Sequence, residues 1–134
     1  MIDIESEIFD MISKKLREDN RKIFVTGENV KSPSSFPCAS IVEVDNQVYR
    51  NTRTTSAIEN HAQLLYEVNV YSNKTNGKKS EAKKILSLVD TEFSNLGFTR
   101  VMTSPIPNER DSTIYRIVAR YRAIVSKDKT IYRR

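Results

Sequence analysis

The stretch LLYEVNVYSNKTNGKKSEAKKILSLVDTEFSNLG, residues 64–97, carries the fold prediction. Apolar side chains alternate along residues 64–72, which is typical of a half-buried strand, and its inner face would hold Leu64, Tyr66, Val68 and Val70. A polar turn, 73–77, follows. Residues 78–96 repeat apolar side chains at steps of three and four, which predicts an amphipathic helix with a stripe of Ala82, Ile85, Leu86, Val89, Phe93 and Leu96. Gly97 stands where a glycine commonly ends a helix.

Two more strands are expected after this unit. Residues 98–103 predict a strand, and Pro105 and Pro107 are expected to end it. Residues 113–125 alternate again. One face holds Tyr115, Ile117, Ala119, Tyr121, Ala123 and Val125, and the other face carries a stripe of Arg116, Arg120 and Arg122.

The residues before the unit predict a helix and shorter strands. Residues 3–17 repeat isoleucine, methionine and leucine at helical spacing, and acidic side chains crowd the first turn. Residues 22–26 and 38–45 are expected to be strands. Asp45 and Asn46 indicate a turn, after which residues 47–50 would return as a hairpin arm.

The predicted order is therefore α-β-β-(β)-β-α-β-β. We expect an α+β fold over residues 1–134, a single domain with a mostly antiparallel sheet packed against two amphipathic helices. Residues 126–134 form a basic C-terminal tail that is expected to be partly mobile.

The charge is distributed unevenly along the 134 residues, whose formal net charge is +5. Residues 1–20 hold six acids and three bases, which sum to −3, whereas residues 98–134 hold nine bases and three acids, which sum to +6. Opposite ends of this kind suit a head-to-tail contact between copies, although they also suit two solvated faces. No apolar run approaches the roughly 18 residues of a membrane span, so no membrane partner is expected.

The residues do not form a recognisable catalytic set, and we expect no enzyme, cofactor or metal site. Cys38 is the only cysteine and His61 the only histidine, and no sequence feature brings them together. The loop NKTNGKKS resembles a phosphate-binding loop only at Gly77 and Lys78, so a polar turn before a solvated helix start is the better interpretation.

Three groups of residues are candidates for contacts with partners. The first is the stripe of Arg116, Arg120 and Arg122, which suits a nucleic-acid backbone or an acidic neighbour, or else a solvated sheet face paired with Glu43 or Glu67. The second is Lys78 and Lys79 at the helix start. The third is a polar excursion over residues 49–60, which is expected to project as a hairpin and holds Arg50, Thr52, Arg53, Thr54 and Thr55.

Four segments resemble one known family when taken in order. They are FPCASIVEVDN (36–46), ENHAQLLYEVNVYSNKTNGKKSEAKKIL (59–86), FSNLGFTRVMTSPIPN (93–108) and STIYRIVARYRAIV (112–125). Together they resemble the lambda-like bacteriophage tail terminator, or tail completion, proteins. The similarity spans about residues 36–125, and its weight comes from the order of the segments because the family has no diagnostic motif.

This resemblance implies a structural virion protein. Six copies would form a homo-hexameric ring on the last ring of tail tube protein, stop the tube from growing and present a surface to the head-side neck or connector protein. A sheath protein would be a further partner in a contractile tail, and DNA would pass the lumen without sequence-specific binding. The protein would assemble in the bacterial host cytoplasm and reside at the tail–neck junction of the virion.

Two alternatives stay open from the sequence. A head-completion or neck adaptor protein has a similar size and also meets the tail axis. A small basic DNA-binding protein belongs to another class and is suggested by the net charge of +5. The arginine stripe, Lys78 and Lys79, and the 49–60 excursion are the expected ring or partner contacts in the terminator interpretation.

Overall fold

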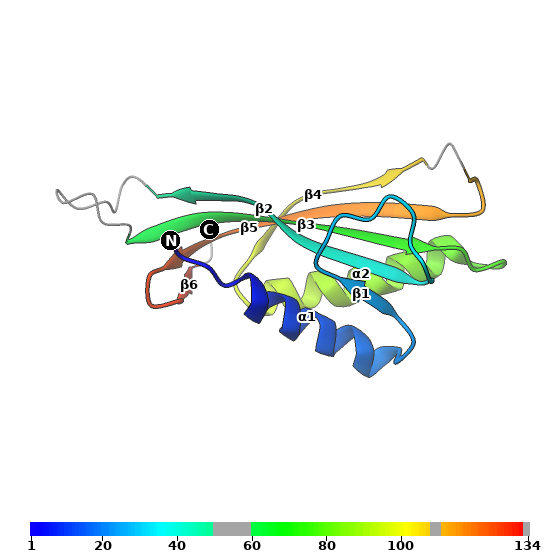
Figure 1. Ribbon diagram of the computed structural model, residues 1–134, viewed down its shortest axis with the longest axis horizontal. Helices are drawn as coiled ribbons and strands as arrows, with labels where there is room; N and C mark the ends of the chain where they lie inside the picture. The colour runs from blue at the N-terminus through cyan, green and yellow to red at the C-terminus, as the bar shows by residue number, and fades with distance from the viewer. Residues whose placement is uncertain (50–59, 108–110, 133–134) are drawn as a thin grey trace.

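A computed structural model describes residues 1–49, 60–107 and 111–132. Within them the chain forms one α+β domain, with two helices covering one face of a six-stranded sheet (Figure 1). The predicted fold class is therefore confirmed. The elements are α1 (Glu5–Asp19), β1 (Phe24–Thr26), β2 (Cys38–Val48), β3 (His61–Ser72), α2 (Lys78–Asn95), β4 (Thr99–Ile106), β5 (Tyr115–Ser126) and β6 (Ile131–Tyr132).

The sheet is mostly antiparallel, as predicted. Its strand order is β1-β2-β3-β5-β4, and β6 pairs with the end of β5. Only β1 and β2 run parallel among the described pairings. Helix α1 packs against β2 and α2, while α2 packs beneath β3, β5 and β4. The opposite face of the sheet, which we call the open face, carries neither helix (Figure 1).

The core lies between the sheet and the helices and contains the predicted faces. The alternating apolar residues of β3 and β5 are buried apart from Tyr115, and so is the α2 stripe apart from Leu96; these two side chains are partly buried. Phe93 of α2 stacks on Tyr121 with ring centroids 4.4 Å apart, and it meets Phe98 edge-on at 5.1 Å. These aromatic contacts lock α2 onto the centre of the sheet.

Helix α2 ends as predicted at Gly97. The glycine has φ of 99°, which is left-handed. The amide of Phe98 donates to the carbonyl of Phe93 at 2.9 Å, and that of Gly97 donates to Ser94 at 3.1 Å. This is a Schellman ending, and the contact between the Phe93 and Phe98 rings is its usual apolar companion.

The predicted turn at Asp45 and Asn46 is wrong. β2 continues to Val48 as one strand, so residues 47–48 belong to it and do not form a returning arm. A β-bulge between Glu43 and Asp45 shifts the register, and pairing with β3 then resumes at Asp45 opposite Leu65. The bulge absorbs the turn-forming residues because the long partner strand β3 offers continuous pairing.

One prediction about a strand end also needs correction, and one strand was not predicted. Pro105 does not end β4: it pairs with Ile117, and because β4 is an edge strand, a residue without an N–H donor is tolerated on the side that faces away from the sheet. The C-terminal segment, which we expected to be a partly mobile basic tail, contains a short strand that the sequence did not predict. There β6 pairs with β5, and Lys129 Nζ lies 2.6 Å from Glu7 Oε1 of α1.

Candidate interaction surfaces

The predicted arginine stripe lies on the open face. The pairing of β3 with β5 sets Arg116 opposite Tyr71, Arg120 opposite Glu67 and Arg122 opposite Leu65. These positions share one face because side chains alternate along a strand. A loop before β2 covers one end of this face, where the Tyr71 hydroxyl donates to the Val30 carbonyl at 3.0 Å.

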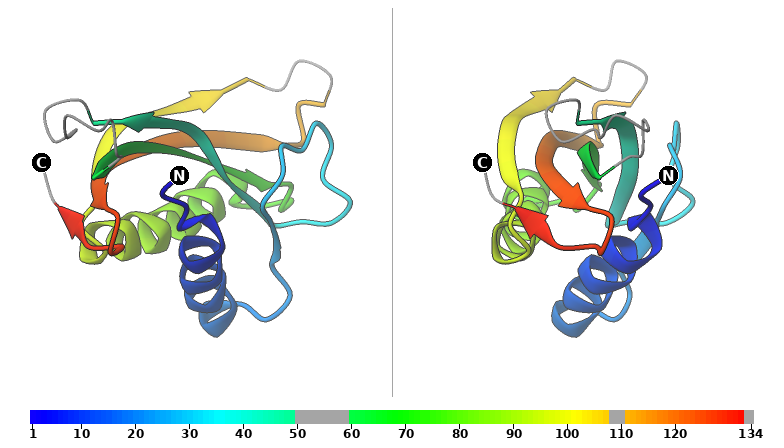
Figure 2. Two further views of the ribbon diagram at one scale, coloured as in Figure 1. Left: turned by 60° about the vertical axis from the view of Figure 1, so that its left-hand side comes forward. Right: turned by 90° about the vertical axis from the view of Figure 1, so that its left-hand side faces the viewer.

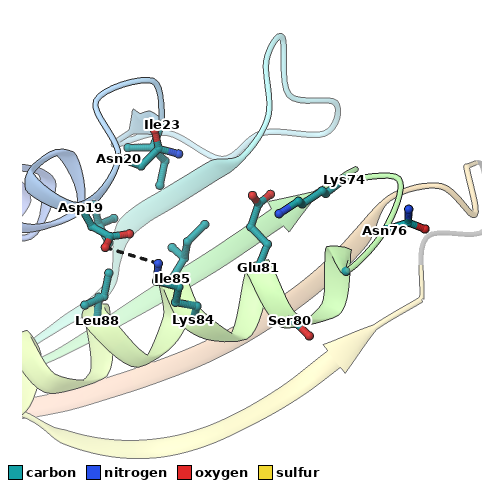
Figure 3. A pocket seen from close by; sticks show the side chains of 12 residues that line it. Asp19, Asn20, Ile23, Lys74, Asn76, Ser80, Glu81, Lys84, Ile85 and Leu88 are labelled. Atoms are coloured by element: carbon teal, nitrogen blue, oxygen red, sulfur yellow. Dashed lines mark ion pairs between the residues drawn. The ribbon is translucent and has the colours of Figure 1, made fainter.

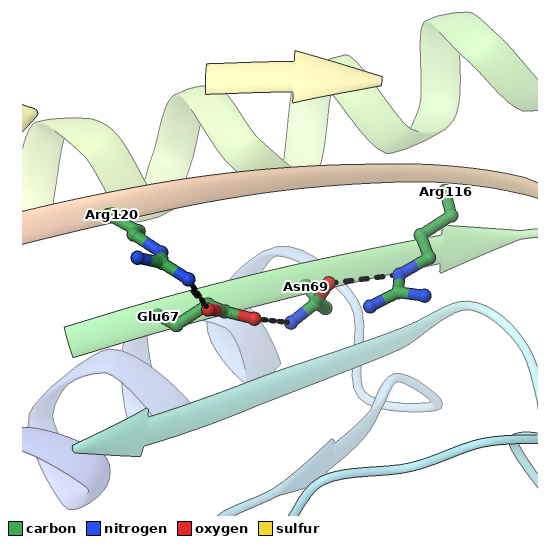
Figure 4. Close-up of polar contacts among 4 residues, drawn as sticks. All are labelled: Glu67, Asn69, Arg116 and Arg120. Carbon is green, nitrogen blue, oxygen red and sulfur yellow. Dashed lines mark hydrogen bonds and ion pairs between the residues drawn. The ribbon is translucent and has the colours of Figure 1, made fainter. Parts of the chain in front are cut away.

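Two of the three arginines are bound within the chain. Figure 4 shows a row in which Arg120 Nη2 lies 2.9 Å from Glu67 Oε2, Asn69 Nδ2 donates to Glu67 Oε1 at 3.0 Å, and Arg116 Nε donates to Asn69 Oδ1 at 2.9 Å. The Arg116 guanidinium also lies 5.4 Å from the centre of the Tyr71 ring. The expected pairing with Glu67 is therefore confirmed, and this cross-strand network reduces the charge left for a partner.

The alternative pairing with Glu43 is wrong. Glu43 pairs with Tyr66, so it lies on the helix-covered face, where the Tyr66 hydroxyl donates to Glu43 Oε1 at 3.2 Å. Burial raises the pKa of the Glu43 carboxyl, and the charges of Glu5 and Asp3 add to the effect. The third arginine, Arg122, has a buried Nε without a hydrogen-bond partner among the described residues.

The other predicted contact residues differ in their surroundings. Lys78 Nζ donates to the Ser112 carbonyl at 2.9 Å and thereby joins the start of α2 to the segment before β5. Lys79 is exposed. The contact residues of the predicted excursion, namely Arg50, Thr52, Arg53, Thr54 and Thr55, lie outside the described residues. The structure describes the base of that segment, where the amide of Tyr49 donates to the His61 carbonyl at 2.8 Å.

Exposed apolar side chains gather on the two outer strands, a feature that the sequence analysis missed. β1 pairs only with Cys38–Ser40 of β2, so no strand of the described residues covers the rest of that edge, where the Glu43 amide donates to Glu5 Oε2 at 2.8 Å. On the other side of the sheet the edge strand is β4. Val44 and Val48 on β2 are 42% and 44% exposed, and Val101 and Met102 on β4 are 49% and 38% exposed. Both strands carry a bulge here. A bulge breaks the alternation of inward and outward side chains, so the sequence pattern did not predict that these residues are exposed.

A groove runs beside each outer strand, and the two grooves differ in charge. The right-hand view of Figure 2 shows α1 on the side of β2 and α2 on the side of β4. The groove between α1 and the β1–β2 edge has a volume of about 500 Å³ and carries Glu5, Asp10 and Glu28. The groove between α2 and β4 has a volume of about 410 Å³ and carries Lys83, Arg100 and Asp90.

We name these surfaces by their charge. The acidic flank consists of Glu5, Asp10 and Glu28 with Val44 on the adjoining edge of β2. The basic flank consists of Lys83 and Arg100 with Val101 and Met102 on β4. The Asp90 charge in the basic groove is already paired, because Arg100 Nη1 lies 3.2 Å from Asp90 Oδ1 and the Tyr121 hydroxyl donates to the same oxygen at 3.0 Å.

A third groove lies between the end of α1 and the first half of α2 (Figure 3). Its volume is about 510 Å³, and Ile23, Ile85 and Leu88 give it an apolar side. Lys84 Nζ reaches across it to Asp19 Oδ1 at 3.6 Å, and Glu81 accepts a hydrogen bond from Ser72 at 2.7 Å. These polar groups are satisfied inside the chain, so the groove is a seam between the helices.

Cys38 and His61 lie far apart in the structure. Cys38 pairs with Tyr71, which is ten positions from His61 along β3, and at about 3.3 Å per residue the separation is about 33 Å. Burial also raises the pKa of the Cys38 thiol to about 11. A cysteine–histidine pair is therefore excluded.

Two further searches of the described part of the chain gave no site. In residues 1–49, 60–107 and 111–132, no cluster of three or more His, Cys, Asp and Glu residues could hold a metal ion. The helices in the same ranges are too short or too polar to cross a membrane.

Comparison of the chain with protein-family models and with curated proteins finds no match.

Proposed function

We propose that this chain is a structural protein of a phage tail, a tail terminator that forms a hexameric ring on the end of the tail tube. The ring ends tube polymerisation and offers an attachment surface to the head-side neck or connector protein. Its partners are other copies of itself, the tail tube protein and, in a contractile tail, the sheath protein. DNA passes through its lumen without sequence-specific binding, and the protein resides at the tail–neck junction of the virion.

The observation that carries this proposal is the pair of exposed apolar edges. Solvent-exposed valine and methionine side chains on both outer strands favour protein–protein contacts on two sides of one domain. Two such sides are what a subunit inside a ring needs, because each copy has two neighbours. The ordered sequence segments that resemble tail terminators support the same interpretation and add the tube as the structure being capped.

A direct experiment mixes the purified protein with tail tubes and images the tubes by negative-stain electron microscopy. We expect a ring at one end of each tube and no further growth when tube protein is added. Tubes that stay bare and continue to lengthen at saturating protein would refute the proposal. A tube with a ring at a random position along its side would refute it too.

Deletion of the gene from its phage separates the terminator from the neck adaptor. Loss of a terminator leaves overlong tails, whereas loss of a neck adaptor leaves tails of normal length without heads. The DNA-binding alternative predicts duplex binding whose affinity falls steeply with salt. The binding of Arg116 and Arg120 to Asn69 and Glu67 weakens that alternative.

A further inference from the structure

We propose that the acidic flank of one copy docks on the basic flank of the next copy, and that this is the contact that repeats around the ring. The inference deepens the proposed function, and it rests on that function for ring closure and the number of copies. The contact itself follows from two surfaces that are both present on one chain. The expected occupant of each flank is therefore a second copy of this protein.

Charge gives the first argument. Glu5, Asp10 and Glu28 line the acidic groove, and no lysine or arginine lines it among the described residues. On the other side, Lys83 is exposed and makes no ion pair with any described residue, while Arg100 keeps half of its side chain exposed beside its partner Asp90. Lys79 precedes Lys83 by four residues and so adds positive charge to the same side of α2. Surfaces of opposite sign attract and orient each other.

The free strand edges give the second argument. A strand edge with exposed apolar side chains tends to associate, unless the fold blocks it. Here Val44 lies on the part of β2 that no strand of the described residues covers. Val101 and Met102 stand on β4 between Arg100 and Thr103, which line the basic groove, and Met102 itself pairs with Arg120 and so faces the open side of this edge strand. Each flank therefore combines an apolar strip with charged groups next to it, which is the usual composition of a protein interface.

The placement of the flanks determines the kind of contact. The two flanks lie at opposite edges of the sheet. β2 with α1 is at one edge, and β4 with α2 is at the other (Figure 2). A contact between two different surfaces is heterologous, so the growing assembly keeps one unused acidic flank at one end and one unused basic flank at the other after each docking step. Such contacts continue until they close into a ring or grow into a filament. A two-fold dimer would instead use one surface twice.

Cysteine crosslinking tests the contact on the full chain without tubes. We would place one exposed thiol on each flank with Val44→Cys and Met102→Cys, and treat the protein at high concentration with a short bismaleimide. Cys38 can stay because it is fully buried and its pKa is raised to about 11. An equal mixture of the two single variants should give crosslinked dimers, and the double variant should give a ladder of higher oligomers. Dimers from either single variant alone, or no crosslink in the mixture, would overturn the proposal.

Charge exchange provides the second measurement. Lys83→Glu in the Met102→Cys chain should lower the crosslinked yield about tenfold, and Asp10→Lys in the Val44→Cys partner should restore it. Lys74→Glu changes the same charge on a turn outside both flanks and should leave the yield unchanged. Equal losses for Lys83→Glu and Lys74→Glu, or no rescue by Asp10→Lys, would show that the flanks do not meet.

The test of the contact between flanks and the test of tube capping can fail independently of each other. Flank-specific crosslinks in a protein that ignores tail tubes would retain the self-contact and refute the tail role. Capping of tubes by a protein whose flanks never crosslink, with or without tubes present, would retain the tail role and refute the contact. The unfolding midpoint of each variant in urea should match the parent, because all five substituted side chains are exposed.

Discussion

The two left-handed glycines next to α2 offer a direct measurement of how firmly the C-terminal strand is docked. Gly77 and Gly97 have φ values of 93° and 99°, so an alanine at either site suffers the same backbone strain of about 1–2 kcal/mol. Their surroundings differ. A Cβ on Gly77 would meet no atom within 4 Å, whereas a Cβ on Gly97 would lie 3.0 Å from Cγ2 of Ile131 and 3.7 Å from its Cβ.

Gly97→Ala should therefore cost more than Gly77→Ala. The atom in the way is a branch at Cβ of Ile131, and it cannot move away unless β6 shifts. Overpacking of this kind costs typically about 1–3 kcal/mol, so we expect Gly77→Ala to lower the free energy of unfolding by about 1–2 kcal/mol and Gly97→Ala by about 2–5 kcal/mol. Urea unfolding followed by circular dichroism measures both values.

Ile131→Ala completes the test as a double-mutant cycle. The substitution removes Cγ2, so Gly97→Ala in that background should cost no more than Gly77→Ala, and the cycle should show a coupling of about 1 kcal/mol or more. Gly77→Ala combined with Ile131→Ala should show additive effects. Equal costs for the two glycine substitutions in the parent chain would mean that Ile131 does not rest on Gly97. The account of a docked β6 would then be wrong.

Three further outcomes are expected from the contacts in the core and on the open face. Phe93→Ala should lower the free energy of unfolding by about 3–5 kcal/mol in urea, because it leaves a cavity beside the Tyr121 ring, and Phe93→Leu should lose clearly less. Glu43→Gln should stabilise the protein at neutral pH, because burial raises the pKa of the Glu43 carboxyl in the folded state above the usual 4.5. The parent therefore loses stability as pH rises through that raised pKa, and the difference in stability between parent and variant should vanish well below pH 4.5. Glu67→Ala should cost about 0.5–1 kcal/mol, less at high salt, because its partner Arg120 is nearly half exposed; a loss above 2 kcal/mol would contradict this assignment.

The sequence predicted the elements that have both a clear period and a partner of the same length. The α2 stripe and the inner faces of β3 and β5 repeat regularly, and all three are buried against one another. The end of α2 was predictable as well, because only the chain near Gly97 takes part in it. Local pattern sufficed in these places because the tertiary contacts reinforce it.

The errors have one physical cause, which is that strand pairing overrides local signals. Asp45 and Asn46 favour a turn in isolation, yet a bulge lets β2 continue along β3. Pro105 would break a central strand but fits the outer side of β4. The short strand β6 was not predicted, because it depends on the free edge that β5 offers beside Ile124 and Val125. Each outcome depends on which strand lies next to the segment, and the residues of the segment alone do not determine that.

The sequence alone predicts the arginine stripe but not the two flanks, because each flank joins residues from separate elements. The stripe follows from alternation within one strand, but Arg120 is paired with Glu67 and Arg116 donates to the neutral Asn69 amide on the neighbouring strand. The acidic groove, by contrast, joins Asp10 of α1 to Glu28 of the loop after β1, and the basic groove joins Lys83 of α2 to Arg100 of β4. A charge is available to a partner when folding leaves it without a neighbour of opposite sign. Lys83 meets this condition better than Arg120 does, so its reversal should disturb assembly more than the reversal of Arg120.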